Sequence, residues 1–171
     1  VGGIGAATAN LCAAFGMRVL GIDARNEHKS AAEISPPDQL DALLEEADFI
    51  VTTVPHTPET EGMWNAVSFA RCRKGSAFVN IGRGMTTRLD DLVGALESGH
   101  LSGAALDVYE IEPLPAEHAL WGMENVILTP HIAVADAEDI PDRRVAILLE
   151  NARRFRDREA LTNIVDKSRW F

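Results

Sequence analysis

Two patterns of apolar residues alternate along this chain. Short, continuous apolar runs are typical of buried strands, and they occupy residues 18–23, 49–54, 76–81, 102–107 and 125–129. The segments between and after these runs repeat their apolar residues every three or four positions, which is typical of helices. Apolar strands that alternate with helices predict an α/β fold, with a doubly wound parallel sheet covered on both faces.

The predicted helices have recognisable faces and ends. The first is expected to bury a face made of Ile4, Thr8, Leu11, Cys12 and Phe15. Gly16 and Gly99 are predicted to end the first and third helices, and Asp38 and Thr87 to cap the second and third. Residues 139–158 predict a long helix with the apolar stripe Val145, Leu148, Leu149, Ala152 and Phe155. Its other faces are rich in arginine and acidic residues, which favours a solvated, ion-paired surface over a binding patch.

Composition narrows the class of protein. Of the 171 residues, 46% are apolar, which allows a sizeable core, and no apolar run approaches the ~20 residues of a membrane span. Acidic residues outnumber basic ones 26 to 16, and the net charge of −10 argues against a nucleic-acid partner. Only Cys12 and Cys72 are present, and no secretory leader is visible, so we expect a cytoplasmic location. The histidines lack metal-ligand spacing, and no metal site is predicted.

The first residues of the chain form a glycine-rich segment. Gly2 and Gly5 have the spacing of the second and third glycines of a GxGxxG motif, which lets a pyrophosphate approach a helix N-terminus. Asp23 ends the next predicted strand, where a carboxylate accepts hydrogen bonds from a ribose and repels a 2′-phosphate. This pattern predicts NAD binding, with NADP less favoured, although Arg25 weakens that preference. The alternative is an ordinary glycine-rich turn with a solvated aspartate.

Three polar segments follow predicted strands at the sheet edge where open parallel sheets bind ligands. They are residues 79–84, 107–115 and 128–132. We expect them to bring Arg83, Glu112 and His131 to one edge of the sheet. Each of these residues alone is more often structural or solvated, whereas the three together indicate a catalytic site.

These segments resemble the D-isomer-specific 2-hydroxyacid dehydrogenases. The family's motifs occur in its order as VGGIG, VPHTPET-GM, NIGRG, GAALDVYEIEPLP and NVILTPHIA. The resemblance implies an NAD-dependent oxidoreductase that transfers a hydride between NAD(H) and a small 2-hydroxy or 2-oxo acid, of the glyoxylate, hydroxypyruvate or glycerate type. It implies that Arg83 binds the substrate carboxylate and polarises the carbonyl, and that His131 is the general acid in reduction and the base in oxidation. Glu112 would orient His131 and favour its protonated form.

The resemblance also implies which residues contact the cofactor and how the chain assembles. The implied cofactor contacts are Gly2, Gly3, Ile4, Gly5, Asp23, Val54, Pro55, Thr60, Ile81, Gly82, Arg83, Asp107 and His131. A homodimer formed through nucleotide-binding domains is implied, with the loop 114–121 as a contributor. His56 departs from the residue that the family often has, and it is expected, with Trp64 and Asn65, to adjoin the nicotinamide.

The chain also departs from the family in its extent. Residues 1–138 correspond to the NAD-binding domain without its leading glycine and first strand, and residues 139–171 to a helix and tail that in the family return to a substrate domain. We therefore expect a fragment of a longer polypeptide, inactive by itself.

Two alternatives within the family remain open at this stage. One is a non-catalytic, NAD-binding regulatory module, as in the family's corepressors, which can keep the same three residues. The other is a phosphite-type dehydrogenase, which also keeps them. Formate-type dehydrogenases have glutamine where Glu112 stands here, which counts against that activity.

Overall fold

The computed structural model describes residues 1–24, 29–134, 140–165 and 167. These fall into two compact units, Val1–His131 and Ile132–Phe171, which are described separately. Arg25 and the last two residues, Trp170 and Phe171, lie outside the described residues, and so does the start of the helix predicted over 139–158.

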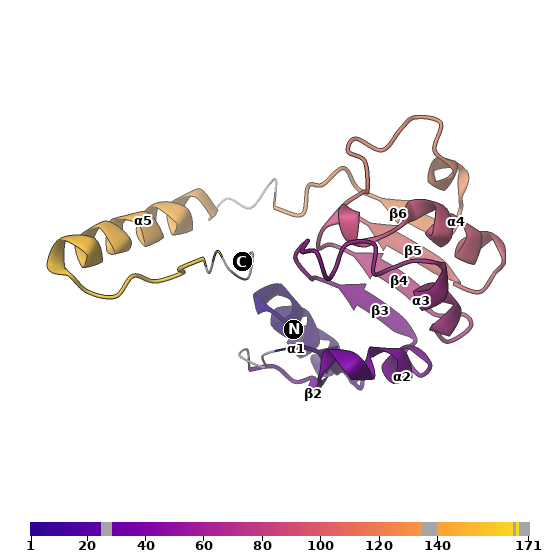
Figure 1. Ribbon diagram of the computed structural model, residues 1–171, viewed down its shortest axis with the longest axis horizontal. Coiled ribbons are helices and arrows are strands. Elements are labelled where there is room, and N and C mark those ends of the chain that lie inside the picture. Colours follow the sequence, from indigo (N-terminus) through magenta and orange to yellow (C-terminus); the bar gives the residue numbers. More distant parts are fainter. Residues whose placement is uncertain (25–28, 135–139, 166, 168–171) are drawn as a thin grey trace. The chain divides into compact units, whose positions relative to one another are not determined.

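The strands of the first unit form two parallel sheets (Figure 1). In the smaller sheet β1 (Leu20–Ile22) pairs with β2 (Glu33–Ser35). The larger sheet has the order β3 (Phe49–Thr52), β4 (Ala77–Asn80), β5 (Gly103–Leu106) and β6 (Val126–Leu128). Each predicted apolar run contains one of these strands, shorter than expected at its ends, and the α/β class with parallel strands is confirmed. β2 was not predicted, because it is short and partly polar.

Helices connect these strands. They are α1 (Gly3–Ala14), α2 (Leu40–Leu44), α3 (Ala66–Arg71) and α4 (Leu89–Glu97), with 3₁₀ turns at Pro37–Gln39, Gly84–Thr86 and Ala119–Gly122. Gly16 and Gly99 have φ angles of 82° and 67° just beyond α1 and α4, as the sequence predicts for residues that end helices.

Both predicted caps are wrong. Asp38 lies inside the 3₁₀ turn that precedes α2, and the residue that caps α2 is Gln39, without a side-chain hydrogen bond. Arg88, not Thr87, occupies the N-cap of α4. The Thr87 hydroxyl is buried and accepts a hydrogen bond from the Asn80 amide instead, because the turn before it places that side chain inside the protein.

The core lies between α2, α3 and α4 and one face of the four-stranded sheet. Ile50, Phe78 and Ala104 point into it from three neighbouring strands, and they meet Phe69 of α3 and Leu92 of α4. Figure 1 shows α3 and α4 beside this sheet. The residues next to these along each strand point away from the core, because successive side chains of a strand lie on opposite faces of the sheet.

Among the described residues of the first unit, helices cover one face of the four-stranded sheet. Phe49, Val51 and Ile127 lie on the other face of the four-stranded sheet and are exposed in the described structure. These residues belong to apolar runs, so the sequence correctly marked both faces as apolar but could not tell which parts of the chain cover each.

The predicted inner face of α1 is also wrong. Ala6 and Ala9 are its buried residues, whereas Ile4, Leu11 and Phe15 are exposed, Phe15 by 87%. The small alanines allow the helix to approach the protein closely, and the larger residues of the expected stripe then lie outside. The pattern of apolar positions does not take side-chain size into account, and here the small side chains form the buried face.

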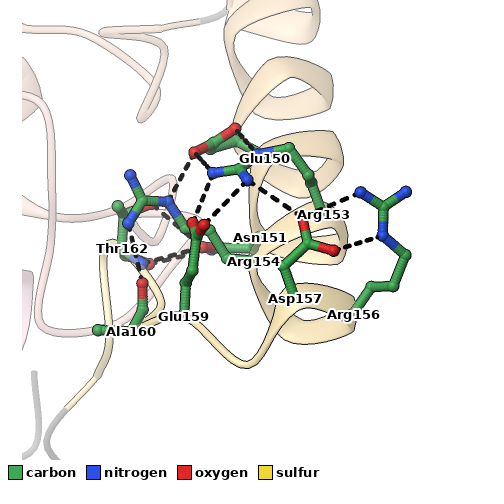
Figure 2. Close-up of polar contacts among 9 residues, drawn as sticks. All are labelled: Glu150, Asn151, Arg153, Arg154, Arg156, Asp157, Glu159, Ala160 and Thr162. Atoms are coloured by element: carbon green, nitrogen blue, oxygen red, sulfur yellow. Dashed lines mark hydrogen bonds and ion pairs between the residues drawn. The ribbon is translucent and has the colours of Figure 1, made fainter.

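The second unit, Ile132–Phe171, contains α5 (Ile140–Asp157). The apolar stripe predicted for this helix is present but exposed, with Phe155 at 78%. Glu150 pairs with Arg153 and Arg154 at 3.1 and 2.6 Å, which confirms the predicted ion-paired surface (Figure 2). Asn151 exchanges hydrogen bonds with the Thr162 backbone, so the segment beyond the helix folds back along it (Figure 2). None of the described helices is long and apolar enough to span a membrane.

Candidate active site

The segments that follow the strands meet at the carboxyl edge of the sheets. A Cβ added to Gly82, after β4, would lie 2.7 Å from the carbonyl oxygen of Val54, after β3. A Cβ added to Gly5 would lie 3.0 Å from the hydroxyl of Thr53. Both glycines are therefore required by close packing, and they bring the beginning of α1 and the ends of β3 and β4 together.

Gly2 and Gly3 differ from Gly5 because the protein itself does not require glycine there. An added Cβ at either position would meet no atom within 4 Å, and Gly2 has an ordinary extended backbone with φ of −79°. Gly2 is the N-cap of α1, without a side-chain cap, and the first turn holds no acidic residue. The bare helix N-terminus, with backbone open to close approach, fits a pyrophosphate.

Asp23 lies beside this glycine loop. Its Oδ2 lies 2.8 Å from the backbone nitrogen of Val1, the residue before Gly2. Asp23 follows β1 directly, and its N–H donates to the Ser35 carbonyl oxygen of β2. The predicted neighbourhood of the glycine loop and the carboxylate is therefore present.

Hydrogen bonds between its own residues stabilise the loop after β3. The Thr60 hydroxyl donates to the Pro55 carbonyl oxygen at 2.7 Å and accepts from the Thr57 N–H at 2.8 Å. His56, in the same loop, has its Nε2 3.2 Å from the Glu61 carboxylate. Thr60, predicted to contact the cofactor, thus holds the Pro55 segment in shape.

Trp64 and Asn65, which were expected to adjoin the nicotinamide, make contacts within the fold. Trp64 is buried and packs edge-on against Phe78, with ring centroids 5.2 Å apart. The Asn65 side chain accepts from the Ser68 N–H while the Ser68 hydroxyl accepts from the Asn65 N–H, which is a capping box on α3.

Glu112 and His131 form a hydrogen-bonded pair, as expected. The Nδ1 atom of His131 lies 2.8 Å from the Glu112 Oε2, and the Tyr109 N–H donates to the other carboxylate oxygen at 3.0 Å. Burial raises the pKa of the Glu112 carboxyl, but the hydrogen bonds from His131 and Tyr109 outweigh it, so the pKa lies below its ordinary value. With Nδ1 directed to the carboxylate, Nε2 of His131 is the atom left to exchange a proton with a substrate.

The backbone of His131 is in the left-handed region, with φ of 55°, and its N–H donates to the Thr129 carbonyl oxygen. A non-glycine residue rarely adopts this conformation, and such strain concentrates at functional sites. The tight turn it forms directs the imidazole back toward Glu112.

Arg83 lies in the segment after β4, and its side chain is exposed. Its neighbour Gly84 packs so closely on Tyr109 that an added Cβ would overlap the Tyr109 backbone. Because the N–H of Tyr109 binds Glu112, the Arg83 segment and the Glu112–His131 pair converge on the same residue. The structure therefore brings the three sequence-predicted catalytic residues to one region.

The ends of β5 and β6 are held together behind this pair. The Thr129 hydroxyl donates to the buried Asp107 carboxylate at 2.6 Å. The Tyr109 hydroxyl donates to the Thr129 carbonyl oxygen at 2.8 Å. Asp107, predicted to contact the cofactor, is thus engaged by its neighbours in the fold.

Sequence reasoning missed Asn80, Gly84 and Tyr109, which support the site without reacting in it. One signal was available: Asn80 is a polar residue inside an otherwise apolar strand, and buried polar residues normally have specific hydrogen-bond partners. The roles of Gly84 and Tyr109 depend on contacts between distant segments, which a single sequence does not reveal.

Comparison with known proteins decides the family. The model of the family described as D-isomer specific 2-hydroxyacid dehydrogenase, NAD binding domain, matches residues 1–133. The chain belongs to this family. Among its relatives, a glyoxylate reductase of Korarchaeum cryptofilum is 37% identical over 98% of this chain and 50% of its own length. The chain therefore spans about half the length of such 2-hydroxyacid dehydrogenases.

Solved structures of the family have the same fold. A D-isomer specific 2-hydroxyacid dehydrogenase of Xanthobacter autotrophicus, in complex with NADPH, superposes with a TM-score of 0.92 and 36% identity, covering 99% of this chain and 69% of that one. An NADPH-dependent glyoxylate/hydroxypyruvate reductase of Sinorhizobium meliloti, in complex with NADP, gives 0.89 and 35%, covering 98% and 54%. Nicotinamide cofactor binding is therefore a property of the family domain that this chain contains.

Two further expectations from the sequence concern metals and assembly. Within the described residues, no group of three or more His, Cys, Asp and Glu side chains could hold a metal ion. The homodimer and the contribution of the loop 114–121 to it stay predictions. In that loop Leu114 is buried and Trp121 is exposed.

Proposed function

We propose that this protein is an oxidoreductase that transfers a hydride between NAD(H) and a small 2-hydroxy or 2-oxo acid, of the glyoxylate, hydroxypyruvate or glycerate type. The observation that carries the proposal is the Glu112–His131 pair beside the Arg83 segment, at the carboxyl edge of the sheet. An imidazole that is hydrogen-bonded to an ionised carboxylate is held in one orientation, and it can then donate or accept a proton. The names of the relatives support the substrate class.

The residues at the beginning of α1 would hold the cofactor. Gly2 and Gly3 leave the helix N-terminus open to a pyrophosphate, and Asp23 would accept hydrogen bonds from the adjacent ribose. The nicotinamide cofactor, when bound, supplies the hydride in reduction and accepts it in oxidation.

The remaining chemistry falls to three side chains. Arg83 would bind the substrate carboxylate with both arms of its guanidinium, which fixes the carbonyl carbon in place. In reduction, Nε2 of His131 donates a proton to the carbonyl oxygen as that oxygen becomes a hydroxyl, and in oxidation the neutral imidazole takes the proton back. Glu112 holds the ring by its Nδ1 and balances the charge of the imidazolium.

We propose NAD as the preferred cofactor. Asp23 supports this preference, since a carboxylate at the end of β1 would repel a 2′-phosphate. The two solved relatives described above contain NADPH or NADP, so a comparison of NADH with NADPH is part of any activity measurement.

We also propose the domain arrangement expected from the sequence, with residues 1–138 as the cofactor-binding domain and 139–171 as a helix and tail that pack on a substrate domain. Val1 supports the doubly wound form of this domain. It contacts Gly21 of β1 and also Gly5, which packs on Thr53 just after β3. A strand leading into Val1 would therefore lie between β1 and β3 and join the two sheets.

Two substitutions, made in the full polypeptide that the gene encodes, test whether Arg83 and His131 are catalytic. Arg83→Ala and His131→Ala should each lower turnover of 2-oxo acids by about 10²-fold or more, while NADH still binds. Arg73→Ala, which removes an exposed arginine paired with Asp48, is the matched control and should leave turnover unchanged. Wild-type activity in either variant removes that residue from the catalytic set. Cofactor binding by the wild-type protein without turnover of any 2-oxo acid would favour the regulatory module instead.

A further inference from the structure

Asn80, the last residue of β4, is completely buried at 0% exposure, three residues before Arg83. Its amide makes four polar contacts, all with the segment that carries Arg83. The Nδ2 atom donates to the Thr87 hydroxyl at 3.0 Å and lies 3.3 Å from the Arg83 carbonyl oxygen and 3.4 Å from the Thr86 hydroxyl. The Oδ1 atom accepts from the Gly82 N–H at 2.9 Å.

These contacts fix the backbone both before and after Arg83 in the sequence. Gly82 is bound before it, and Thr86 and Thr87 after it. The Thr86 hydroxyl donates in turn to the Arg83 carbonyl oxygen at 2.7 Å, so the 3₁₀ turn Gly84–Thr86 closes around the amide. Only a side chain with both a donor and an acceptor can serve all of these partners.

The Arg83 side chain has little support of its own. Within the described part of the chain, its guanidinium makes one hydrogen bond, from Nη1 to the Gly82 carbonyl oxygen at 2.8 Å, and it is exposed. The direction in which it leaves the backbone therefore depends on what holds that backbone. Asn80 holds it from inside, and the contact of Gly84 with Tyr109 holds it on the other side.

We propose that Asn80 is a positioning residue for Arg83, whose buried amide fixes the backbone from Gly82 to Thr87 so that the guanidinium meets the substrate carboxylate. This inference rests on the function proposed for Arg83. It makes Asn80 a determinant of carboxylate recognition although the residue is buried too deeply to touch a substrate.

The kinetic test uses Asn80→Leu, which keeps the volume and removes every hydrogen bond, and Asn80→Asp, which keeps the acceptor alone. Both should lower kcat/KM for a 2-oxo acid by about tenfold or more, and KM for the 2-oxo acid should rise more than KM for NADH. Thr52→Val is the matched control. Thr52 is the strand partner of Asn80 and equally buried, but its hydroxyl has no hydrogen-bond partner among the described residues, so activity should stay unchanged.

A double-mutant cycle separates positioning from a loss of stability. In an Arg83→Ala background, Asn80→Leu should cause little further loss of kcat/KM, because the residue it positions is gone. Phe78→Leu, in the core on the same strand, also destabilises the protein but leaves the hydrogen bonds of the Asn80 amide in place, and its effect should add to that of Arg83→Ala. Additive losses for Asn80→Leu would overturn the proposal.

Hydrogen exchange provides a readout that needs no activity. Asn80→Leu should speed exchange at the Gly82 amide and in the turn Gly84–Thr86, while the amides of α4 keep the protection seen in the Phe78→Leu protein. Unchanged exchange in this segment overturns the proposal. If exchange accelerates but the wild-type protein turns over no 2-oxo acid, the function proposed for Arg83 fails and the structural role of Asn80 in the segment stands.

Discussion

At the scale of single residues, the proposed chemistry depends on how Glu112 holds His131. The carboxylate receives one hydrogen bond from the imidazole and one from the Tyr109 N–H, and both stabilise its ionised form. The lowered pKa of Glu112 means that the carboxylate stays charged as the pH falls toward its ordinary value of 4.5 and is neutralised only below it. The pair therefore keeps one negative charge beside the imidazole throughout the physiological range.

Glu112→Gln tests the importance of that charge. The amide can still accept a hydrogen bond from Nδ1, but it cannot stabilise an imidazolium by charge. Reduction of a 2-oxo acid places a positive charge on the imidazole, so kcat for reduction should fall about tenfold or more in the variant. The measurement is kcat for reduction at neutral pH.

Glu110→Gln is the control for this prediction, because Glu110 lies two residues away and pairs with Arg88 at the surface. Its kcat for reduction should match that of the wild type. A Glu112→Gln protein with the wild-type kcat would show that orientation alone, without charge, accounts for the pair.

Catalytic candidates were predictable at this scale, whereas their supports were not. Arg83, Glu112 and His131 carry functional groups at motif positions after strands, so their types and order were informative. Thr87 was predicted as a cap from its type and place, yet its hydroxyl serves Asn80. That outcome depends on the path of the backbone between them, which residue type does not determine.

At the scale of elements, strands and helices were predicted better than the faces they bury. The apolar runs located β1 and β3 to β6, and Gly16 and Gly99 marked helix ends correctly. The orientation of α1 was predicted wrongly, since the helix packs through Ala6 and Ala9. Hydrophobic periodicity treats Ala and Phe as similar, whereas the buried face of this helix is made of the small residues.

The helix α5 offers a test of how much exposed ion pairs contribute. Hydrogen bonds from Arg153 and Arg154 lower the pKa of Glu150 to about 2, so the pairs persist above its ordinary value of 4.5 and are lost as the pH falls toward 2. Glu150→Gln should speed amide exchange in α5 modestly at low salt, because exposed pairs stabilise a helix little. The difference from the wild type should nearly disappear at high salt, where such pairs are screened.

Arg144→Gln is the control on the same helix, since Arg144 has no ion pair among the described residues. It should leave exchange in α5 nearly unchanged at either salt concentration. Equal effects of the two substitutions would mean that the paired geometry at Glu150 contributes nothing to the helix.

At the scale of the whole molecule, the chain combines a family domain with a separate helical unit. The family model matches residues 1–133, which is close to the boundary at His131 between the two units. The apolar stripe of α5 and the second face of the four-stranded sheet are exposed in the described structure. Composition and periodicity identified these surfaces as apolar, but the partners that bury an apolar surface are not encoded in its own pattern.

The proposed activity is tested by measuring the oxidation of NADH and NADPH by the full polypeptide that its gene encodes, with glyoxylate, hydroxypyruvate or glycolaldehyde as the second substrate. Glycolaldehyde has a carbonyl but no carboxylate for Arg83 to bind. We expect turnover with both 2-oxo acids, kcat/KM lower by about 10²-fold or more with glycolaldehyde, and a preference for NADH that reflects Asp23. Turnover of glycolaldehyde as fast as of glyoxylate, or no oxidation of either cofactor with any 2-oxo acid, would overturn the proposed function.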